Sequence, residues 1–299
     1  MVRELNRWYY RLRGDPGGVD FFAEDWDNLL ILDACRYDSF AERHDLPGTL
    51  EARYSRASAT SELLYDYFDG ERLLDTVYVT ANPQLYRRRD EIDVQFHDVV
   101  HVWKDEGWDE AFKTVRPETV ADAAERALER HPDKRLLVHF IQPHFPFIGE
   151  TGRRHLDLDA LDFGDGVING EMGVSGDVVR RAYEENLDLV LPSVERLLYS
   201  LGGRSVVTAD HGELLGERAF PIPMREYGHP AGIRAEALNK VPWHVYQQGP
   251  RRDVVAEPPD ATARGNAANG ERGPGDPQST GAEPSAAVVE ERLRDLGYR

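Results

Sequence analysis

The chain has 299 residues, of which 54 are acidic and 36 basic, and its formal net charge is -18. This charge argues against nucleic acid as a partner, and the single cysteine, Cys35, excludes an internal disulfide. An acid-rich, lysine-poor composition is expected of a halophilic protein from a high-salt cytoplasm, although ordinary acidic proteins can share it.

The first 13 residues interleave arginines with Trp8, Tyr9 and Tyr10. Docking of a short aromatic helix on the protein's own body is the favoured hypothesis, and weak contact with an anionic membrane surface is the second. No stretch approaches the ~20 apolar residues that span a bilayer, and the N-terminus lacks the apolar region of a signal peptide. We therefore expect a cytoplasmic protein, peripheral to the inner membrane face if residues 1–13 contact lipid.

Short apolar runs alternate with amphipathic stretches along the chain, which is typical of βα units and a mainly parallel sheet. Helical periodicity predicts helices over 117–131 and 177–203, with Pro192 kinking or dividing the second. The Asp- and Gly-rich segment 153–177 is expected to be a surface excursion that borders a pocket. Four apolar runs predict strands, and each ends at or near a polar residue: Asp33, Asn82, Gln142 and Asp210.

The chain is expected to divide into three parts. We expect residues 1–250 to form one catalytic domain of α/β class. Residues 251–285 are crowded with Gly, Pro, Ala and charge and predict a disordered linker. Residues 286–299 predict a C-terminal helix whose apolar side chains can dock on the body: Val288, Val289, Leu293 and Leu296.

Asp33 and Asp210 are candidate metal ligands. Ligands collect at the carboxyl ends of strands in open α/β sheets, and an unpaired charge at the end of a buried strand is costly. For Asp33 the alternative is pairing with Arg36 or capping of the next turn. His211 stands beside Asp210 and adds a nitrogen ligand that suits zinc, manganese or another divalent ion.

A hydroxyl and three histidines complete the candidate residues. The stretch "SATSELL" places Thr60 or Ser61 at the start of a helix, where a divalent cation and the helix dipole would favour an alkoxide; a plain N-cap is the alternative. His144 and His229 stand next to prolines in predicted loops, as ligands, substrate contacts or simple turn residues. His139, inside a strand, is expected to be a hydrogen-bonded core residue outside the site.

The segments "LDACRYDSF", "SATSELL", "HFIQPHFPF", "TADHGELLGE" and "GHPAG" together resemble the sulfatase-like branch of the alkaline phosphatase superfamily, from about Asn28 to Tyr246. The resemblance implies a sandwich with a mainly parallel central sheet flanked by helices. It also implies hydrolysis or transfer of phosphate or sulfate esters at one or two divalent metal ions, which could be Mn, Mg, Ca or Zn.

Residue by residue, the resemblance implies that Asp33, Asp210 and His211 hold a metal ion together with the nucleophile Thr60. The stretch "ATSELL" is similar to the threonine-centred element of phosphoglycerol and lipoteichoic-acid synthase relatives. The resemblance also assigns substrate contact to His144, and a second metal or the ester oxygens to His229.

The chain departs from the superfamily in two respects. It lacks the C-x-P-x-R element of formylglycine sulfatases, because Cys35 stands in a different segment and has no proline in the required place. No Asp–His pair stands out in the sequence that would complete a second zinc site. We therefore expect one metal ion and no formylglycine chemistry.

The predicted function is a metal-dependent hydrolase or transferase of phosphate or sulfate esters, acting through a threonine nucleophile on glycans or lipid head groups. A phosphomonoesterase or phosphodiesterase of small molecules is the alternative enzyme. A non-catalytic metal-containing protein that binds a glycan or a partner in cell-surface glycan assembly is the alternative from another class. A scaffold that lies on a membrane through residues 1–13 is the third.

Overall fold

The computed structural model describes residues 2–14, 17–104, 107–156, 173–258 and 284–298. Its helices are α1 (Val2–Arg13), α2 (Tyr37–Arg43), α3 (Thr60–Leu63) with a π-helical turn (Leu64–Phe68), α4 (Gln84–Arg87), α5 (Pro117–Arg130), α6 (Glu150–His155), α8 (Gly176–Ser200), α9 (Glu236–Asn239) and α10 (Ala286–Asp295). Its strands are β1 (Asn28–Leu32), β2 (Thr49–Tyr54), β3 (Arg72–Thr80), β4 (Gln95–His101), β5 (Trp108–Asp109), β6 (Thr114–Val115), β7 (Arg135–Phe140), β8 (Gly203–Thr208), β9 (Leu214–Arg218), β10 (Arg225–Gly228) and β11 (Lys240–Gln248).

Seven strands form a central sheet in the order β2-β11-β8-β1-β7-β3-β4. The five strands from β8 to β4 are parallel, and β11 pairs antiparallel with both β8 and β2. The predicted fold class, α/β with a mainly parallel central sheet flanked by helices, is confirmed. Each of the four predicted apolar runs forms one of the central parallel strands.

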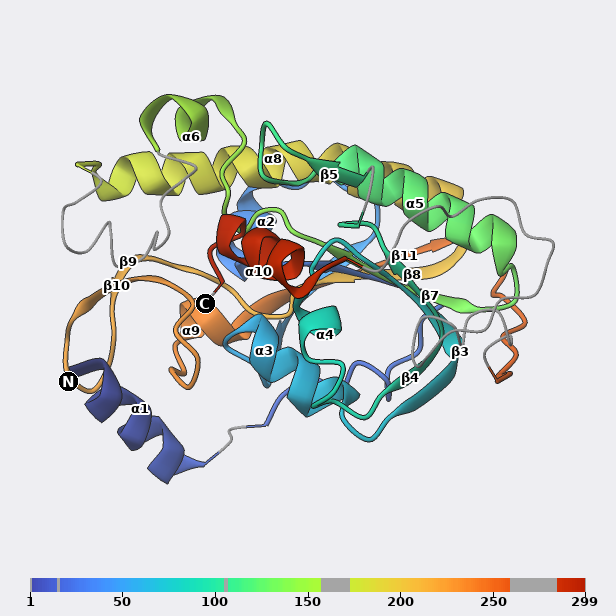
Figure 1. Cartoon of the computed structure of the whole chain (residues 1–299), viewed down its shortest axis with the longest axis horizontal. Helices are drawn as coiled ribbons and strands as arrows, with labels where there is room; N and C mark the ends of the chain where they lie inside the picture. Colours follow the sequence, from blue (N-terminus) through green and yellow to red (C-terminus); the bar gives the residue numbers. More distant parts are fainter. Residues whose placement is uncertain (1, 15–16, 105–106, 157–172, 259–283, 299) are drawn as a thin grey trace.

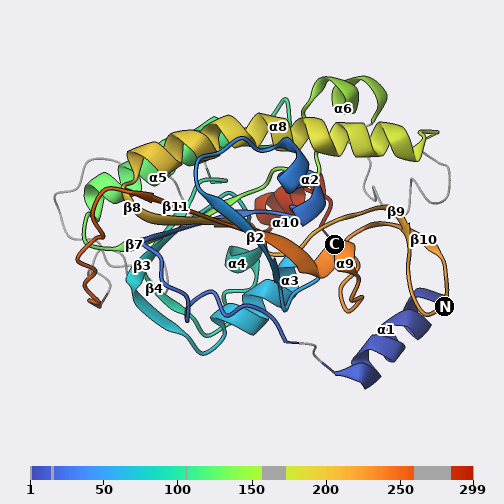
Figure 2. The same ribbon diagram turned by 180° about the vertical axis from the view of Figure 1, so that it is seen from behind.

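The side chains of the sheet alternate between two cores, as a strand buried on both faces requires. Leu30 and Leu32 of β1 pack in one core with apolar residues of α5, α8 and α10. Leu29 and Ile31 pack in the other with apolar residues of α3 and its π-helical turn. Figures 1 and 2 show α5 and α8 covering one face of the sheet, with α3 on the other side.

The two long helices follow the predicted periodicity. The apolar face of α5 includes Val120, Ala123, Ala124 and Ala127, all of which are buried. Pro192 lies inside α8, which continues as one helix of 25 residues. The prediction that Pro192 could divide this helix is therefore wrong. An unbroken α8 matters for the site because its residue Tyr183 contacts the turn after β1.

Helix α10 docks on the body as predicted. Val289, Leu293 and Leu296 are buried in the core that α5 and α8 share. Arg292 donates to the backbone oxygen of Trp103, and its guanidinium lies over the Trp103 and Trp108 rings. The C-terminal end of the described chain therefore belongs to the packed body.

Two predicted segments fall mostly outside the described residues. These are the surface excursion at 153–177, of which 157–172 are not described, and the linker at 251–285, of which 259–283 are not described. Within the described part of the linker, Arg252 binds the backbone oxygens of Lys134 and Leu201. Among the described helices, each is too short or too polar to cross a bilayer.

Candidate metal-dependent active site

The turn after β1 is shaped around Asp33. Ala34 has a φ of 60°, in the left-handed region that a residue with a Cβ rarely occupies. Its N–H donates to Asp210 Oδ1 at 3.0 Å, and its carbonyl oxygen accepts from the Tyr183 hydroxyl at 2.8 Å. These bonds hold a strained turn, as functional sites often do, and they join the ends of β1 and β8.

Thr60 is the first residue of α3, as predicted, but its hydroxyl does not cap the helix. The entry to α3 is held instead by Glu62, whose Oε2 accepts from the backbone N–H of Ser58 at 2.7 Å and from its hydroxyl at 2.9 Å. Arg234 pairs with the same carboxylate at 2.8 Å. The Thr60 hydroxyl is thereby left to face the carboxyl end of the sheet.

Asp33, Thr60, Asp210 and His211 meet at one point, and all four side chains are buried. Thr60 Oγ1 lies 3.4 Å from Asp33 Oδ1, 2.9 Å from Asp210 Oδ2 and 3.3 Å from His211 Nε2. His211 Nε2 lies 3.7 Å from Asp33 Oδ1 and 3.2 Å from Asp210 Oδ2. The structure therefore brings together all four residues that were predicted to hold a metal ion.

This cluster contains more acceptors than protons. His211 Nδ1 lies 2.8 Å from the Gly212 carbonyl oxygen, so Nδ1 carries the ring proton and Nε2 keeps its lone pair. That lone pair and the facing oxygens of Asp33 and Asp210 surround the hydroxyl of Thr60, whose one proton can satisfy only one of them. A cation at the centre would satisfy all three acceptors.

Burial disfavours the charged forms of Asp33, Asp210 and His211. It raises the pKa of Asp33 well above its usual value, with the charge of Asp210 adding to the effect, and it raises the pKa of Asp210. Burial also lowers the pKa of His211 well below its usual value, which keeps the imidazole neutral. Two carboxylates that are costly to ionise and a neutral histidine are the groups that a divalent cation stabilises.

The spacing of the donor atoms fits such a cation. Ligands about 2.0–2.2 Å from a tetrahedral ion lie about 3.3–3.6 Å from one another. Five distances among the donors of Asp33, Thr60, Asp210 and His211 span 2.9–3.7 Å. Two carboxylates, a hydroxyl and an imidazole suit zinc or manganese in particular.

Arg36 does not pair with Asp33, which was the alternative to a metal site. Its guanidinium binds Asp38 at 2.5 Å and Glu217 at 2.6 Å. Asp33 Oδ2 instead accepts hydrogen bonds from Asn82 at 3.0 Å and from Tyr298 at 2.5 Å. Neither neighbour neutralises the carboxylate.

His139 is buried and hydrogen-bonded, as expected, but it borders the site. Its Nδ1 pairs with the Tyr78 hydroxyl at 2.8 Å, and its Nε2 lies 4.0 Å from Asp210 Oδ2. Burial lowers its pKa to about 4. Its Nε2 has no hydrogen-bond partner among the described residues, and donor atoms of Asp33, His139 and Asp210 lie within 4.8 Å of one another, so the neutral ring is a further possible metal ligand.

A second group of possible ligands lines the pocket next to the first. Donor atoms of His144, Glu213 and His229 lie within 4.8 Å of one another. His144 Nδ1 pairs with the Phe145 carbonyl oxygen, so its Nε2 keeps a lone pair. This arrangement could hold a further ion or the oxygens of an ester.

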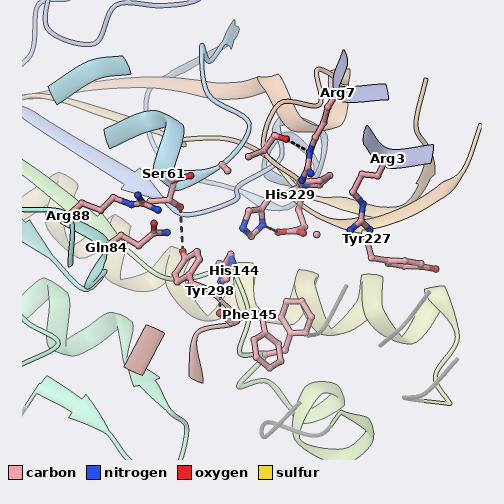
Figure 3. Close-up of a pocket in the computed structure, with 18 residues that line it drawn as sticks. Arg3, Arg7, Ser61, Gln84, Arg88, His144, Phe145, Tyr227, His229 and Tyr298 are labelled. Carbon is pink, nitrogen blue, oxygen red and sulfur yellow. Dashed lines mark hydrogen bonds and ion pairs between the residues drawn. The ribbon is translucent and has the colours of Figure 1, made fainter. Parts of the chain in front are cut away.

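A cavity of about 440 Å³ reaches the second group directly and the first group through Thr60. Its lining includes Thr60, His144 and His229, with Tyr298 on one wall. Figure 3 shows His144 next to Tyr298, with His229 above them. The Thr60 hydroxyl is thus buried in the protein yet faces a space that a substrate group can enter.

Glu213 is expected to control the charge of His229. Burial lowers the pKa of this histidine, but the Glu213 carboxylate, 3.1 Å from Nδ1, outweighs burial and the net pKa is raised above 6.5. The contribution of this pair to the free energy of unfolding is therefore complete below pH 6.5 and is lost as pH rises through the raised pKa.

Replacing Glu213 with glutamine should lower the pKa of His229 below that of the wild type, because burial is then unopposed. An NMR titration of the His229 ring protons in metal-free protein measures this change. An unchanged pKa in Glu213→Gln would show that the ion pair does not form in solution.

Comparison with known proteins finds similarity among solved structures. No family model matches the chain, and no curated protein matches it. Among solved structures, the chain is similar to two crystal structures of the C-terminal periplasmic domain of EptC from Escherichia coli, one of them a complex with zinc. Sequence identity is 12% in both, the TM-scores are 0.42 and 0.41, and the matches cover 76% of this chain and 75% of those chains.

Three residues of the site were not predicted from the sequence. Asn82 was noted only as the polar end of a strand, although the same signal identified Asp33. Glu213 lies within the quoted stretch "TADHGELLGE", next to residues that were assigned a role. Tyr298 had no signal, because 265 positions separate it from Asp33.

Proposed function

We propose that this protein is a metal-dependent enzyme of the sulfatase-like branch of the alkaline phosphatase superfamily, which transfers or hydrolyses phosphate or sulfate esters through Thr60. The observation that carries the proposal is the convergence of the Thr60 hydroxyl with Asp33, Asp210 and His211 at the floor of a cavity. A structural threonine would cap its helix or bond to the backbone, and Thr60 does neither.

The residues of the site have distinct tasks in this reaction. A divalent cation held by Asp33, Asp210 and His211 would lower the pKa of the Thr60 hydroxyl and would stabilise negative charge on the ester oxygens. The Thr60 hydroxyl would release its proton to the solvent of the cavity that it lines. Its Oγ1 then forms a bond to phosphorus or sulfur while the bond to the leaving alcohol breaks and that alcohol takes a proton from charged His229, which gives a covalent Thr60 ester. Water or an acceptor hydroxyl then takes the group from Thr60.

His144 and His229 face the space where the ester would lie. His144 presents a neutral Nε2, because burial lowers its pKa well below the usual value. His229, charged more readily beside Glu213, can stabilise negative charge on the ester or protonate the leaving oxygen. The backbone N–H groups of Thr60 and Ser61 at the start of α3 have no acceptor within the helix and can donate to the ester oxygens.

Arginines at the cavity suit an anionic substrate. Arg3, Arg7 and Arg88 contribute to its lining, in a chain whose net charge is -18. A phosphate ester on a glycan or on a lipid head group has the charge and size for this space. The missing C-x-P-x-R element favours a phosphate over a sulfate that needs formylglycine.

An assay of model esters tests this function. We expect the metal-loaded protein to turn over nitrophenyl phosphate or bis-nitrophenyl phosphate faster than nitrophenyl sulfate, with Mn²⁺, Zn²⁺, Mg²⁺ and Ca²⁺ supplied in turn. Chelation should abolish turnover and readdition of the ion should restore it. Bound metal that raises stability without turnover of any ester would instead support a non-catalytic binding protein.

A further inference from the structure

The end of the chain reaches the candidate reaction centre. Tyr298 follows α10, and its hydroxyl donates to Asp33 Oδ2 at 2.5 Å and accepts from Asn82 Nδ2 at 2.9 Å. The same oxygen lies 3.4 Å from Thr60 Oγ1. Figure 3 shows the ring beside His144, with which it stacks at 5.0 Å between centroids and 20° between planes.

These contacts decide which oxygen of Asp33 is available. Oδ2 receives two hydrogen bonds, from Asn82 and from Tyr298, so its lone pairs are engaged. Oδ1 is left to face Thr60 Oγ1 at 3.4 Å and His211 Nε2 at 3.7 Å. Hydrogen bonds of this kind orient a ligand toward its ion.

Tyr298 is held by the packing of α10. Leu293 and Leu296 are buried in the main core, and the Tyr298 N–H donates to the Leu293 carbonyl oxygen at 2.8 Å. Glu290 pairs with Arg87 at 3.0 Å, next to the cavity residue Arg88. Tyr298 is therefore held in place by the packing of α10 and forms a fixed part of the cavity wall.

We propose that Tyr298 is a positioning residue: its hydroxyl fixes Asp33 for metal binding and its ring fixes His144 against the substrate cavity. This inference rests on the proposed metal site. The catalytic site would then be assembled from both ends of the chain sequence, and a chain that lacks α10 would have an incomplete site.

Metal affinity of three full-length variants tests the proposal. Tyr298→Phe keeps the ring and loses the hydroxyl, so the Kd for Mn²⁺ alone or Zn²⁺ alone, measured by calorimetry, should rise about 10–100-fold. Tyr298→Ala should weaken binding at least as much. The control Tyr199→Phe changes a tyrosine that is 50% exposed on α8 and should leave the Kd unchanged.

The outcomes separate this inference from the proposed function. If the wild type binds and Tyr298→Phe binds with the same Kd, the role of Tyr298 is overturned and the metal site stands. If Tyr298→Ala binds metal more tightly or turns over esters faster than the wild type, Tyr298 obstructs the site and the proposal is wrong. If the wild type binds neither ion, both proposals fail.

A different observation concerns the outer face of α1. Leu5, Trp8 and Leu12 lie on one side of this helix, at i, i+3 and i+7, and are 48%, 58% and 66% exposed. Phe220 and Ile222, between β9 and β10, are exposed as well. These five residues form what we call the apolar patch.

The two parts of the patch are held side by side. The side chain of Asn6 exchanges two hydrogen bonds with the backbone of Ile222, at 3.1 and 3.0 Å. The Tyr9 ring contacts the Phe220 ring at 5.4 Å. Docking of α1 on the body, the favoured prediction, is therefore observed, but it uses polar and aromatic residues and turns the apolar side outward.

Positive charge surrounds the patch. Arg11 and Arg13 of α1 are exposed, as are Arg218 and Arg225 at the ends of β9 and β10. Glu4 is the only acidic residue of α1, in a protein whose net charge is -18. On the cavity side of the same helix, Arg3 and Arg7 contribute to the lining.

We infer that the apolar patch docks on an anionic lipid surface. Leucine and tryptophan side chains enter the boundary between head groups and acyl chains, while arginines pair with anionic head groups. Local positive charge is required for this contact, because the rest of the protein is repelled by such a surface.

Fluorescence of Trp8 tests this docking. The other four tryptophans of the chain are buried, so a blue shift of emission reports on Trp8. Vesicles of equal parts phosphatidylglycerol and phosphatidylcholine should cause the shift, and pure phosphatidylcholine should cause less.

Leu5→Ser with Leu12→Ser should weaken binding at least about tenfold, whereas Leu189→Ser, at an exposed position of α8, should not. No shift with the anionic vesicles would overturn the proposal, and so would a shift that depends on protein concentration alone, which would indicate a second copy of the chain on the patch.

Discussion

Replacing Thr60 with alanine is expected to lower ester turnover at least about 10³-fold. Among the described residues, the hydroxyls of Thr60 and Tyr298 are the two that contact the cluster of Asp33, Asp210 and His211 from the cavity side. The protein should fold normally, since the lost hydroxyl caps no helix. Steady-state kinetics with saturating metal ion measures the loss. Mass spectrometry of wild type incubated with a reactive ester should find the modification on the peptide that contains Thr60.

Ser61→Ala is the matched control for this experiment. Ser61 is the next residue of α3 and also lines the cavity, but its hydroxyl makes no bond to the cluster within the described structure. Turnover should stay within about tenfold of the wild type. An active Thr60→Ala enzyme, or a Ser61→Ala variant as inactive as Thr60→Ala, would remove Thr60 from the role of nucleophile.

Replacing Asp33 with asparagine is expected to separate stability from activity. In metal-free protein near pH 8, the free energy of unfolding of the variant should exceed that of the wild type by about 1–3 kcal/mol. The reason is that the substitution removes a buried charge that faces Asp210. With saturating metal ion the order should reverse, since only the wild type gains binding free energy. Turnover should fall at least about 10³-fold.

The pH dependence of this difference has a definite sign. The folded-state pKa of Asp33 is raised above 3.8, so ionised Asp33 lowers the free energy of unfolding increasingly as pH rises from 3.8 through the raised pKa. The advantage of Asp33→Asn should therefore be large at pH 8 and vanish toward pH 4. Urea unfolding at the two pH values, with and without chelator, measures it, and the exposed change Asp188→Asn should stay within about 0.5 kcal/mol throughout. An Asp33→Asn protein that is less stable than the metal-free wild type at pH 8 would contradict the account.

The central strands of the sheet could be predicted because buried strands have a recognisable pattern of apolar residues in the sequence. Strands buried on both faces read as apolar runs, and the runs that end at Asp33 and Asp210 form adjacent parallel strands. The carboxyl ends of parallel strands share one edge of the sheet, so the two aspartates had to lie near each other. The helix start offered Thr60 or Ser61, the resemblance selected Thr60, and the structure shows that the Thr60 hydroxyl faces that edge.

Other parts of the site depend on contacts that no local pattern encodes. Asn82 and Tyr298 reach Asp33 through tertiary packing, and Tyr298 does so from α10, beyond a segment that carries no fold signal. Pro192 suggested a break, but α8 continues through it because both halves of the helix bury apolar residues in the same core. Packing overrides local propensity in each case.

A crystal structure of the protein with Mn²⁺ or Zn²⁺, analysed by anomalous scattering, tests the central claim most directly. One ion should lie about 2.0–2.2 Å from an oxygen of Asp33, Thr60 Oγ1, an oxygen of Asp210 and His211 Nε2. An ion bound elsewhere, or none at this cluster under saturating metal, would contradict the account.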